Sequence, residues 1–186
     1  MKITVAITGA SGAIYAHRLL LALKENPSVE KVYVVMSECA VQVWDYELPN
    51  IEIKPCDKVE ILDNKNFFNS IASGSNPADA MVIVPCSMGT VGRVASGVSS
   101  TLLERAADVQ LKEGLPLVVA FRETPLSEIH LENLLKLRRA GAIVMPAAPS
   151  FYSRPLTIEE VADSVVERIL DKILIKSGKK FRWNEK

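Results

Sequence analysis

The chain has 186 residues, of which 48% are hydrophobic and 24% charged, so it can bury one sizeable core without disulfides or a structural metal. The 22 basic and 22 acidic residues cancel, so no overall charge draws the molecule to nucleic acid or an anionic membrane. The cysteines, Cys39, Cys56 and Cys86, are too widely spaced for a disulfide framework or a zinc site. One domain over residues 1–186 is predicted, with a polar tail at 177–186.

The first residues imitate a signal peptide, with one Lys followed by apolar and small residues. Thr4 and Thr8 interrupt this run and a helix-like pattern follows at once, so a first β-strand is predicted instead. The longest stretches without a charge, such as 140–153, are shorter than the roughly 18 to 20 residues of a membrane span. A soluble, cytoplasmic protein is expected.

Short runs rich in Val and Ile alternate along the chain with longer segments of helical spacing, which predicts β-α-β units. The predicted strands are 3–8, 32–36, 80–85, 117–121 and 142–145. The predicted helices are 13–24, 38–46, 88–97, 101–112, 126–140 and 157–176. Continuous apolar runs are typical of strands buried on both faces, so we expect a three-layer α/β/α, Rossmann-like (flavodoxin-like) fold with a parallel sheet.

Two segments carry more specific expectations. Thr157 is predicted to be the N-cap of the last helix, and Glu160 three residues later completes the pattern of a capping box. The segment 50–75 is irregular and polar, and is expected to hold little regular structure.

Small and polar residues follow every predicted strand, at the edge where the ligand crevice of a parallel sheet lies. In chain order these are Gly9, Ala10, Ser11 and Gly12; Ser37; Ser87, Met88, Gly89 and Thr90; Arg122 and Glu123; and a segment that contains Tyr152. Hydroxyls, glycines and one cation are therefore expected to converge at this edge.

The glycine turn at 9–12 permits close approach of a ligand to a helix N-terminus, where free N–H groups favour an anion. It lacks the spacing of a dinucleotide fingerprint, and neither a P-loop nor the Tyr and Lys pair of short-chain dehydrogenases occurs. Ser87 and Thr90 open a second helix in the same way. They indicate either a grip on a phosphate monoester or simple N-capping.

Further cations lie on the predicted helices. Arg105 and Lys112 are two turns apart and share a face, with Asp108 between them as a routine ion-pair partner. This face is either solvated or a phosphate site, and Arg168 is similarly ambiguous. The two histidines, His17 and His130, stand alone and are interpreted as ordinary surface or core residues.

Taken in order and spacing, the segments TGASGAIYAHRLL, VMS, VIVPCSMGT, ERAADVQLKE, RETPLS and AAPSFYSRP resemble the flavin prenyltransferase family of the UbiX type over nearly the whole chain. The resemblance implies a subunit that binds FMN and joins a dimethylallyl group from dimethylallyl phosphate to flavin N5 and C6. The product, prenylated FMN, would serve a decarboxylase of the UbiD type. A large homo-oligomer, a dodecamer, with sites at subunit contacts is also implied.

The resemblance assigns roles to individual residues. Residues implied to hold FMN are Gly9, Ala10, Ser11, Ser37, Ser87, Met88, Gly89, Thr90 and Arg122. Residues implied to hold dimethylallyl phosphate are Tyr152, Arg168, Arg105 and Lys112. Glu123, Ser11 and Glu47 are implied to be catalytic, with Glu123 handling protons. One departure is Asn76, where many relatives carry an aromatic residue.

No metal is expected, because the sequence has no consecutive aspartates of the kind that hold a prenyl diphosphate through magnesium. A monophosphate can instead be met by Arg and Lys through charge-assisted hydrogen bonds. Two alternatives stay open: an FMN-dependent decarboxylase that acts on cysteine-derived carboxylates, and a non-catalytic flavin-binding accessory subunit of a decarboxylase.

Overall fold

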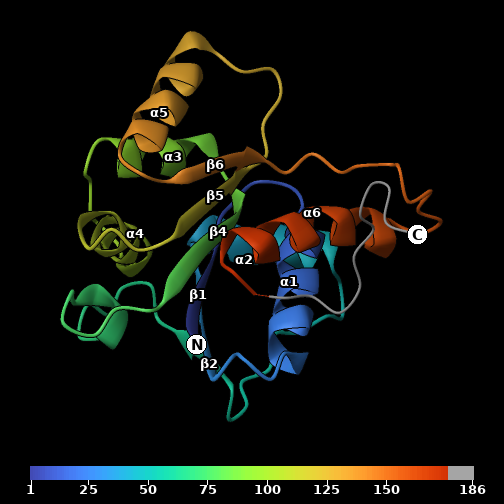
Figure 1. The fold of residues 1–186 in the computed structure, drawn as a ribbon, viewed down its shortest axis with the longest axis horizontal. Helices are drawn as coiled ribbons and strands as arrows, with labels where there is room; N and C mark the ends of the chain where they lie inside the picture. Colours follow the sequence, from blue (N-terminus) through green and yellow to red (C-terminus); the bar gives the residue numbers. More distant parts are fainter. Residues whose placement is uncertain (176–186) are drawn as a thin grey trace.

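The centre of the fold is a parallel sheet of six strands in the order β3-β2-β1-β4-β5-β6 (Figure 1). The structure is a computed structural model that describes residues 1–175. The strands are β1 (Lys2–Ile7), β2 (Lys31–Met36), β3 (Val59–Leu62), β4 (Ala80–Cys86), β5 (Leu117–Phe121) and β6 (Ile143–Pro146).

Two layers of helices cover the two faces of the sheet (Figure 1). One layer consists of α1 (Ala13–Glu25), α2 (Glu38–Glu47) and α6 (Ile158–Lys172). The other consists of α3 (Met88–Ala95), α4 (Leu102–Lys112) and α5 (Glu128–Arg139), with the short 3-10 helix η1 (Ser70–Ala72) beside α4. The predicted three-layer α/β/α fold is confirmed.

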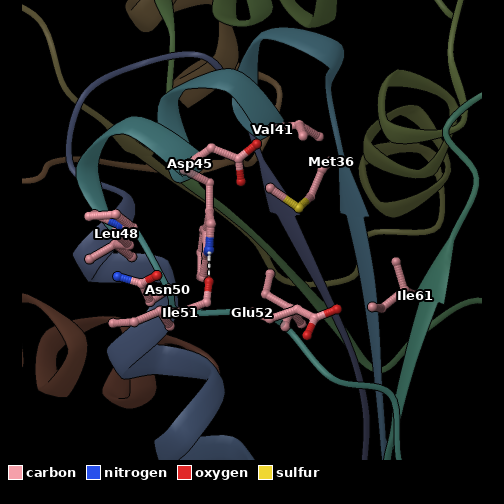
Figure 2. Close-up of a pocket in the computed structure, with 11 residues that line it drawn as sticks. Met36, Val41, Asp45, Leu48, Asn50, Ile51, Glu52 and Ile61 are labelled. Atoms are coloured by element: carbon pink, nitrogen blue, oxygen red, sulfur yellow. Dashed lines mark hydrogen bonds between the residues drawn. The ribbon is translucent and has the colours of Figure 1, made fainter.

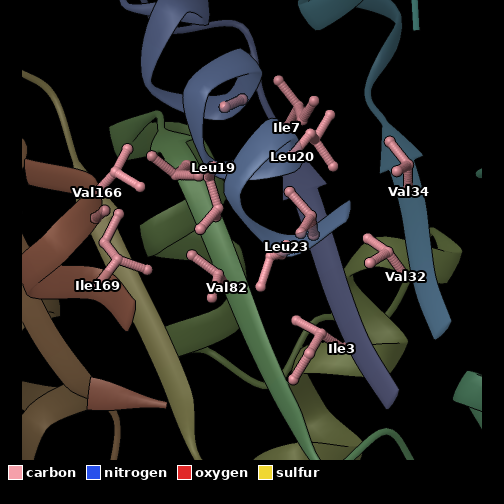
Figure 3. Close-up of a cluster of buried hydrophobic side chains, with 14 of the residues drawn as sticks. Ile3, Ile7, Leu19, Leu20, Leu23, Val32, Val34, Val82, Val166 and Ile169 are labelled. Atoms are coloured by element: carbon pink, nitrogen blue, oxygen red, sulfur yellow. The ribbon is translucent and has the colours of Figure 1, made fainter. Parts of the chain in front are cut away.

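Alternation along the central strands divides the core into two halves. Ile3 and Ile7 of β1 pack towards α1, whereas Ala6 belongs to the cluster on the opposite face. Figure 3 shows the first half, in which Leu23 of α1 and Ile169 of α6 join the β1 side chains. Each such fully buried aliphatic side chain contributes about 1.5–3 kcal/mol, so the sheet is a rigid base for the loops at its edge.

The expectation of little regular structure in 50–75 is wrong in part, because β3 and η1 lie there. β3 is an edge strand: Val59 and Leu62 are buried, but Ile61 is 44% exposed. An edge strand with one solvated face is short and alternating, and it lacks the continuous apolar run of the inner strands. Without β3 the strand order would be of the flavodoxin type; with it, the order is of the Rossmann type.

The last helix differs in detail from its prediction. The Thr157 side chain accepts from the Glu160 N–H (3.2 Å), but the Glu160 carboxylate accepts from Leu156 N–H (2.6 Å) and not from Thr157, so half of the predicted capping box is wrong. The expected helix end at 176 and the tail at 177–186 lie outside the described residues. Within 1–175, no helix is both long and apolar enough to cross a membrane.

Candidate functional site

The switch point of the sheet lies between β1 and β4, where the chain leaves the two strands in opposite directions. In such sheets the ligand crevice lies at the carboxyl ends of these strands. Thr8 holds the two sides together. Its hydroxyl donates to Pro85 O (2.8 Å) and accepts from Ser87 N–H (2.7 Å). The turns that follow β1 and β4 therefore form one rigid unit, and the residues predicted to bind a ligand lie on both of them.

The N-terminus of α1 is occupied by a carboxylate of the chain itself. The carboxylate of Glu47, at the end of α2, accepts hydrogen bonds from the backbone N–H groups of Gly12 and Ala13, both at 2.8 Å, and from the Ser11 side chain. Burial alone would raise the pKa of Glu47, but these hydrogen bonds and the charge of Arg122 lower the pKa below its ordinary value. The anion that the glycine turn favours is thus Glu47, which the sequence did not place there.

Gly9 has a structural reason to be glycine. A Cβ at this position would lie 2.5 Å from the Cβ of Cys39, in the first turn of α2. The missing side chain therefore lets α2 approach the turn after β1, whereas the sequence interpretation assigned the close approach to a ligand. Gly9 and Ser11 nevertheless remain exposed at the crevice.

Ser37 and Ser87 cap two further helices beside the crevice. The Ser37 hydroxyl accepts from Ala40 N–H (3.1 Å) at the start of α2, and Ser87 accepts from Thr90 N–H (3.4 Å) at the start of α3. Both serines are partly exposed, so each hydroxyl can cap its helix and still donate to a ligand. Simple N-capping, one of the two interpretations of Ser87, is confirmed as part of its role.

The other predicted residues of this turn differ in exposure. Gly89 is exposed, so its backbone is open to a ligand. Met88 and Thr90 are 7% and 2% exposed, and the Thr90 hydroxyl bonds within the protein, to Ser87 and Arg93.

Arg122 follows β5 and reaches across the crevice. The side-chain Nε of Arg122 donates to the backbone carbonyl of Ser11 (3.2 Å), and the backbone N–H of Arg122 donates to the carbonyl oxygen of Cys86 (3.1 Å). No ion pair in residues 1–175 includes Arg122. The structure therefore brings together Arg122, Ser11 and Glu47, and leaves the cation able to meet a ligand anion.

Two neighbours complete this part of the site. Glu123 turns back on its own loop, where its carboxylate accepts from Thr124 N–H (3.0 Å), and the salt bridges among the described residues do not involve it. Tyr15 was not predicted: burial raises its pKa, and the nearby charge of Arg122 opposes that rise. Tyr15 stands in the segment GASGAIY, but nothing in its spacing indicated a contact with a residue after β5.

Arg105 and Lys112 lie together on α4, as their spacing predicted. Arg105 donates to Ala72 O (3.1 Å) and pairs with Asp108 (2.7 Å), while Lys112 pairs with Glu113 and lies against Gly74. α4 ends near the start of β5, at the edge of the sheet opposite to the crevice. Within one chain, Lys112 is therefore not brought to Arg122.

Tyr152 and Arg168 lie elsewhere again. Tyr152, in the loop between β6 and α6, is 68% exposed, and Arg168 is on the exposed side of α6 with Asp171 as its partner (3.3 Å). Asn76 is also exposed, four residues before β4. As for metals, residues 1–175 contain no cluster of three His, Cys, Asp or Glu side chains that could hold an ion.

A cavity of about 680 Å³ is separate from this crevice. It lies beside α2 and is lined mainly by apolar side chains, with Asp45 and Glu52 among them (Figure 2). Trp44 Nε1 closes one wall by donating to Ile51 O (2.6 Å). The cavity includes none of the predicted site residues and no cation, so we place the functional site at the carboxyl ends of β1 and β4.

A family model described as Flavoprotein matches residues 1–174. Flavin prenyltransferase UbiX of Methanocaldococcus jannaschii is 44% identical, over 98% of this chain and 98% of the relative. A structure described as a dodecameric FMN-dependent UbiX-like decarboxylase from Escherichia coli O157:H7 is 39% identical, covers 100% of both chains and has a TM-score of 0.91.

Another structure, of AnUbiX in complex with FMN and dimethylallyl pyrophosphate, is 39% identical, covers 99% of this chain and 97% of its own, and has a TM-score of 0.90. By contrast, a peptidyl-cysteine decarboxylase structure is 16% identical with a TM-score of 0.63, which shows the fold alone. With this identity over nearly its full length, the chain belongs to the flavin prenyltransferase family of the UbiX type.

Proposed function

We propose that this chain is a flavin prenyltransferase that transfers a dimethylallyl group from dimethylallyl phosphate to N5 and C6 of reduced FMN. The observation that carries the proposal is Arg122, which has no ion-pair partner in residues 1–175 and is held by the Ser11 carbonyl at the switch point, in a chain of this family. When bound, FMN supplies the ring that accepts the prenyl group. The residues fit FMN because hydroxyls, backbone N–H groups and one cation suit a phosphate and a polar ring edge.

The FMN phosphate is assigned to the N-termini of α2 and α3 and not to that of α1. Glu47 already neutralises the N-terminus of α1, and its charge would repel a second anion there. Ser37, Ser87 and Arg122 remain as donors. The residues proposed to line the flavin between them are Gly9, Ala10, Ser11, Met88 and Gly89, whereas the buried Thr90 is proposed to act through Ser87 and not to touch the flavin.

In the proposed reaction the prenyl carbon would exchange its bond to phosphate for a bond to flavin N5, which would lose its proton. The prenyl double bond would then take up a proton as its tertiary carbon bonds to C6, and C6 would lose its proton. Glu123 is proposed to take the C6 proton, because it follows Arg122 directly in the chain and its carboxylate has no ion-pair partner among the described residues. Glu47, kept ionised by its hydrogen bonds, and Ser11 are proposed to stabilise positive charge and relay protons.

Dimethylallyl phosphate is assigned to Arg105, Lys112, Tyr152 and Arg168. Since these residues are spread over separate parts of one chain, the complete site is proposed to form between neighbouring copies in a large homo-oligomer, and a 39%-identical relative is described as dodecameric. The prenylated flavin is proposed to pass to a decarboxylase of the UbiD type. A cytoplasmic location stays a prediction.

The product's role can be tested with an apo UbiD-type decarboxylase. The chain is incubated anaerobically with reduced FMN and dimethylallyl phosphate, the protein is filtered away, and the flavin alone is added to the apoenzyme. Activation by this flavin supports the proposal. Activation only when the chain itself is present would instead indicate an accessory subunit, and release of CO₂ from a peptide with a C-terminal cysteine would indicate the decarboxylase alternative.

A further inference from the structure

Arg93, one turn after Thr90 on α3, is a cation that none of the sequence motifs singles out. Its Nη2 donates to Thr90 Oγ1 (3.2 Å), and its Nε forms an ion pair with Glu104 of α4. Glu104 is 3% exposed and also accepts from the N–H groups of Ser100 (2.8 Å) and Thr101 (3.1 Å). A buried carboxylate on the neighbouring helix therefore fixes the orientation of the guanidinium against Thr90.

The direction of one hydrogen bond follows from this arrangement. Thr90 Oγ1 and Ser87 Oγ lie 3.1 Å apart, and either could be the donor. A guanidinium can only donate hydrogen bonds, so Arg93 cannot accept the proton of the Thr90 hydroxyl. Thr90 is 2% exposed, and the side-chain bonds of its hydroxyl in residues 1–175 are those to Ser87 and Arg93, so its proton must go to Ser87.

Ser87 therefore has one unused hydrogen-bonding group, the proton of its own hydroxyl. Its oxygen accepts from the Thr90 hydroxyl and from Thr90 N–H (3.4 Å), which uses both lone pairs. Its own hydroxyl proton is therefore available to donate a hydrogen bond to a ligand next to the exposed Gly89. We propose that Arg93 is a positioning residue that acts through Thr90 to make Ser87 a hydrogen-bond donor to FMN. This inference rests on the proposed function, because it takes FMN as the ligand of this turn.

Removal of Arg93 would undo this orientation. Water could enter the space of the guanidinium and accept the Thr90 proton, and Ser87 could then donate inward to Thr90 Oγ1. The ligand would meet the serine oxygen without its proton, which disfavours an anionic or carbonyl oxygen at that place.

The test measures FMN affinity by titration of flavin fluorescence. The double variant Arg93→Met with Glu104→Gln removes the cation without leaving a buried charge, and should weaken FMN binding by about tenfold. Adding Thr90→Val removes the inward acceptor, so the triple variant should regain affinity to within about twofold of the wild type. Arg139→Met, at the exposed end of α5, is the matched control and should bind FMN as the wild type does.

Restoration by Thr90→Val separates the relay from a direct contact, since a lost contact between Arg93 and FMN would not be restored. The inference is overturned if the double variant binds FMN as tightly as the wild type, or if Thr90→Val restores nothing. If the double variant does not fold, Arg93→Lys can replace it, because it keeps a cation for Glu104 but lacks the forked guanidinium that also reaches Thr90. This variant should show the same loss of FMN affinity and the same restoration by Thr90→Val. A wild-type chain that binds no FMN would refute the proposed function itself.

Discussion

Arg122 Nε donates to the carbonyl oxygen of Ser11 over 3.2 Å, and so joins the turn after β5 to the turn after β1. The two residues are 111 positions apart in the chain. The contact spends one donor of the guanidinium on the protein and leaves the others for a ligand, because Arg122 has no ion-pair partner in residues 1–175.

Replacement of Arg122 should therefore weaken FMN binding much more than it weakens the fold. We expect Arg122→Ala to raise the FMN dissociation constant by about ten- to a hundredfold, the range for a lost hydrogen bond to a charged group. Arg138→Ala, an exposed arginine of α5, is the control. Equal FMN affinity in all three proteins, measured by calorimetry, would remove Arg122 from the binding site.

Glu123 is expected to affect the reaction and not the binding of FMN. Glu123→Gln keeps the size and polarity of the side chain but cannot take up a proton, so product formation should fall by about 100- to 10,000-fold. FMN affinity and melting temperature should stay near the wild-type values, and flavin alkylated at N5 alone is expected to accumulate. A variant that forms the cyclised product at the wild-type rate would show that Glu123 is not the proton acceptor.

A complete site shared between copies predicts complementation between inactive variants. Arg122→Ala loses the flavin side, whereas Arg105→Ala with Lys112→Ala loses the phosphate side. When the two are coexpressed, mixed oligomers should regain about a quarter of the wild-type rate, since random pairing makes some sites intact on both sides. If coexpression restores no activity while mixed oligomers are present, both sides belong to one chain.

Glu47 should make stability depend on pH in the acid range. Its pKa is lowered in the folded chain, so its contribution is fully present above the unfolded pKa of about 4.3 and is lost as pH falls through the lower folded pKa. At pH 7, Glu47→Gln should destabilise the fold by about 1 kcal/mol, as for loss of a helix cap. The difference in unfolding free energy between Glu47→Gln and the wild type, measured by urea unfolding, should vanish in strong acid. A difference that does not depend on pH, or one equalled by the exposed control Glu132→Gln, would contradict this role of Glu47.

The cysteines should differ in reactivity. Burial raises the pKa of Cys86 to about 12, so its thiol should resist a disulfide reagent at pH 8 in the native chain, whereas the exposed Cys39 and Cys56 react. Because Cys39 packs on Gly9 in the turn after β1, where FMN is proposed to bind, FMN should slow the labelling of Cys39 but not that of Cys56. Mass analysis of labelled peptides distinguishes the sites, and equal protection of both thiols would argue against flavin at this turn.

Sequence patterns predicted the inner strands and the edge strand β6 from their apolar runs, and both helical layers from their helical periodicity. They did not predict β3, a short edge strand in which only Val59 and Leu62 are buried and Ile61 is exposed. The residues after β1, β4 and β5 were correctly expected at one edge, since that follows from parallel topology alone. The position of Glu47 on the N-terminus of α1 could not be predicted, because it depends on how α2 packs, and the same holds for Arg93 and Glu104 on neighbouring helices.

The most direct test of the account is the mass of the flavin after anaerobic incubation of the purified chain with reduced FMN and dimethylallyl phosphate. A species with the mass of FMN plus one isoprene unit (C₅H₈) is expected, formed at the same rate when EDTA is added and absent without protein. Recovery of unmodified FMN alone from the wild-type chain, under conditions in which FMN is shown to be bound, would contradict it.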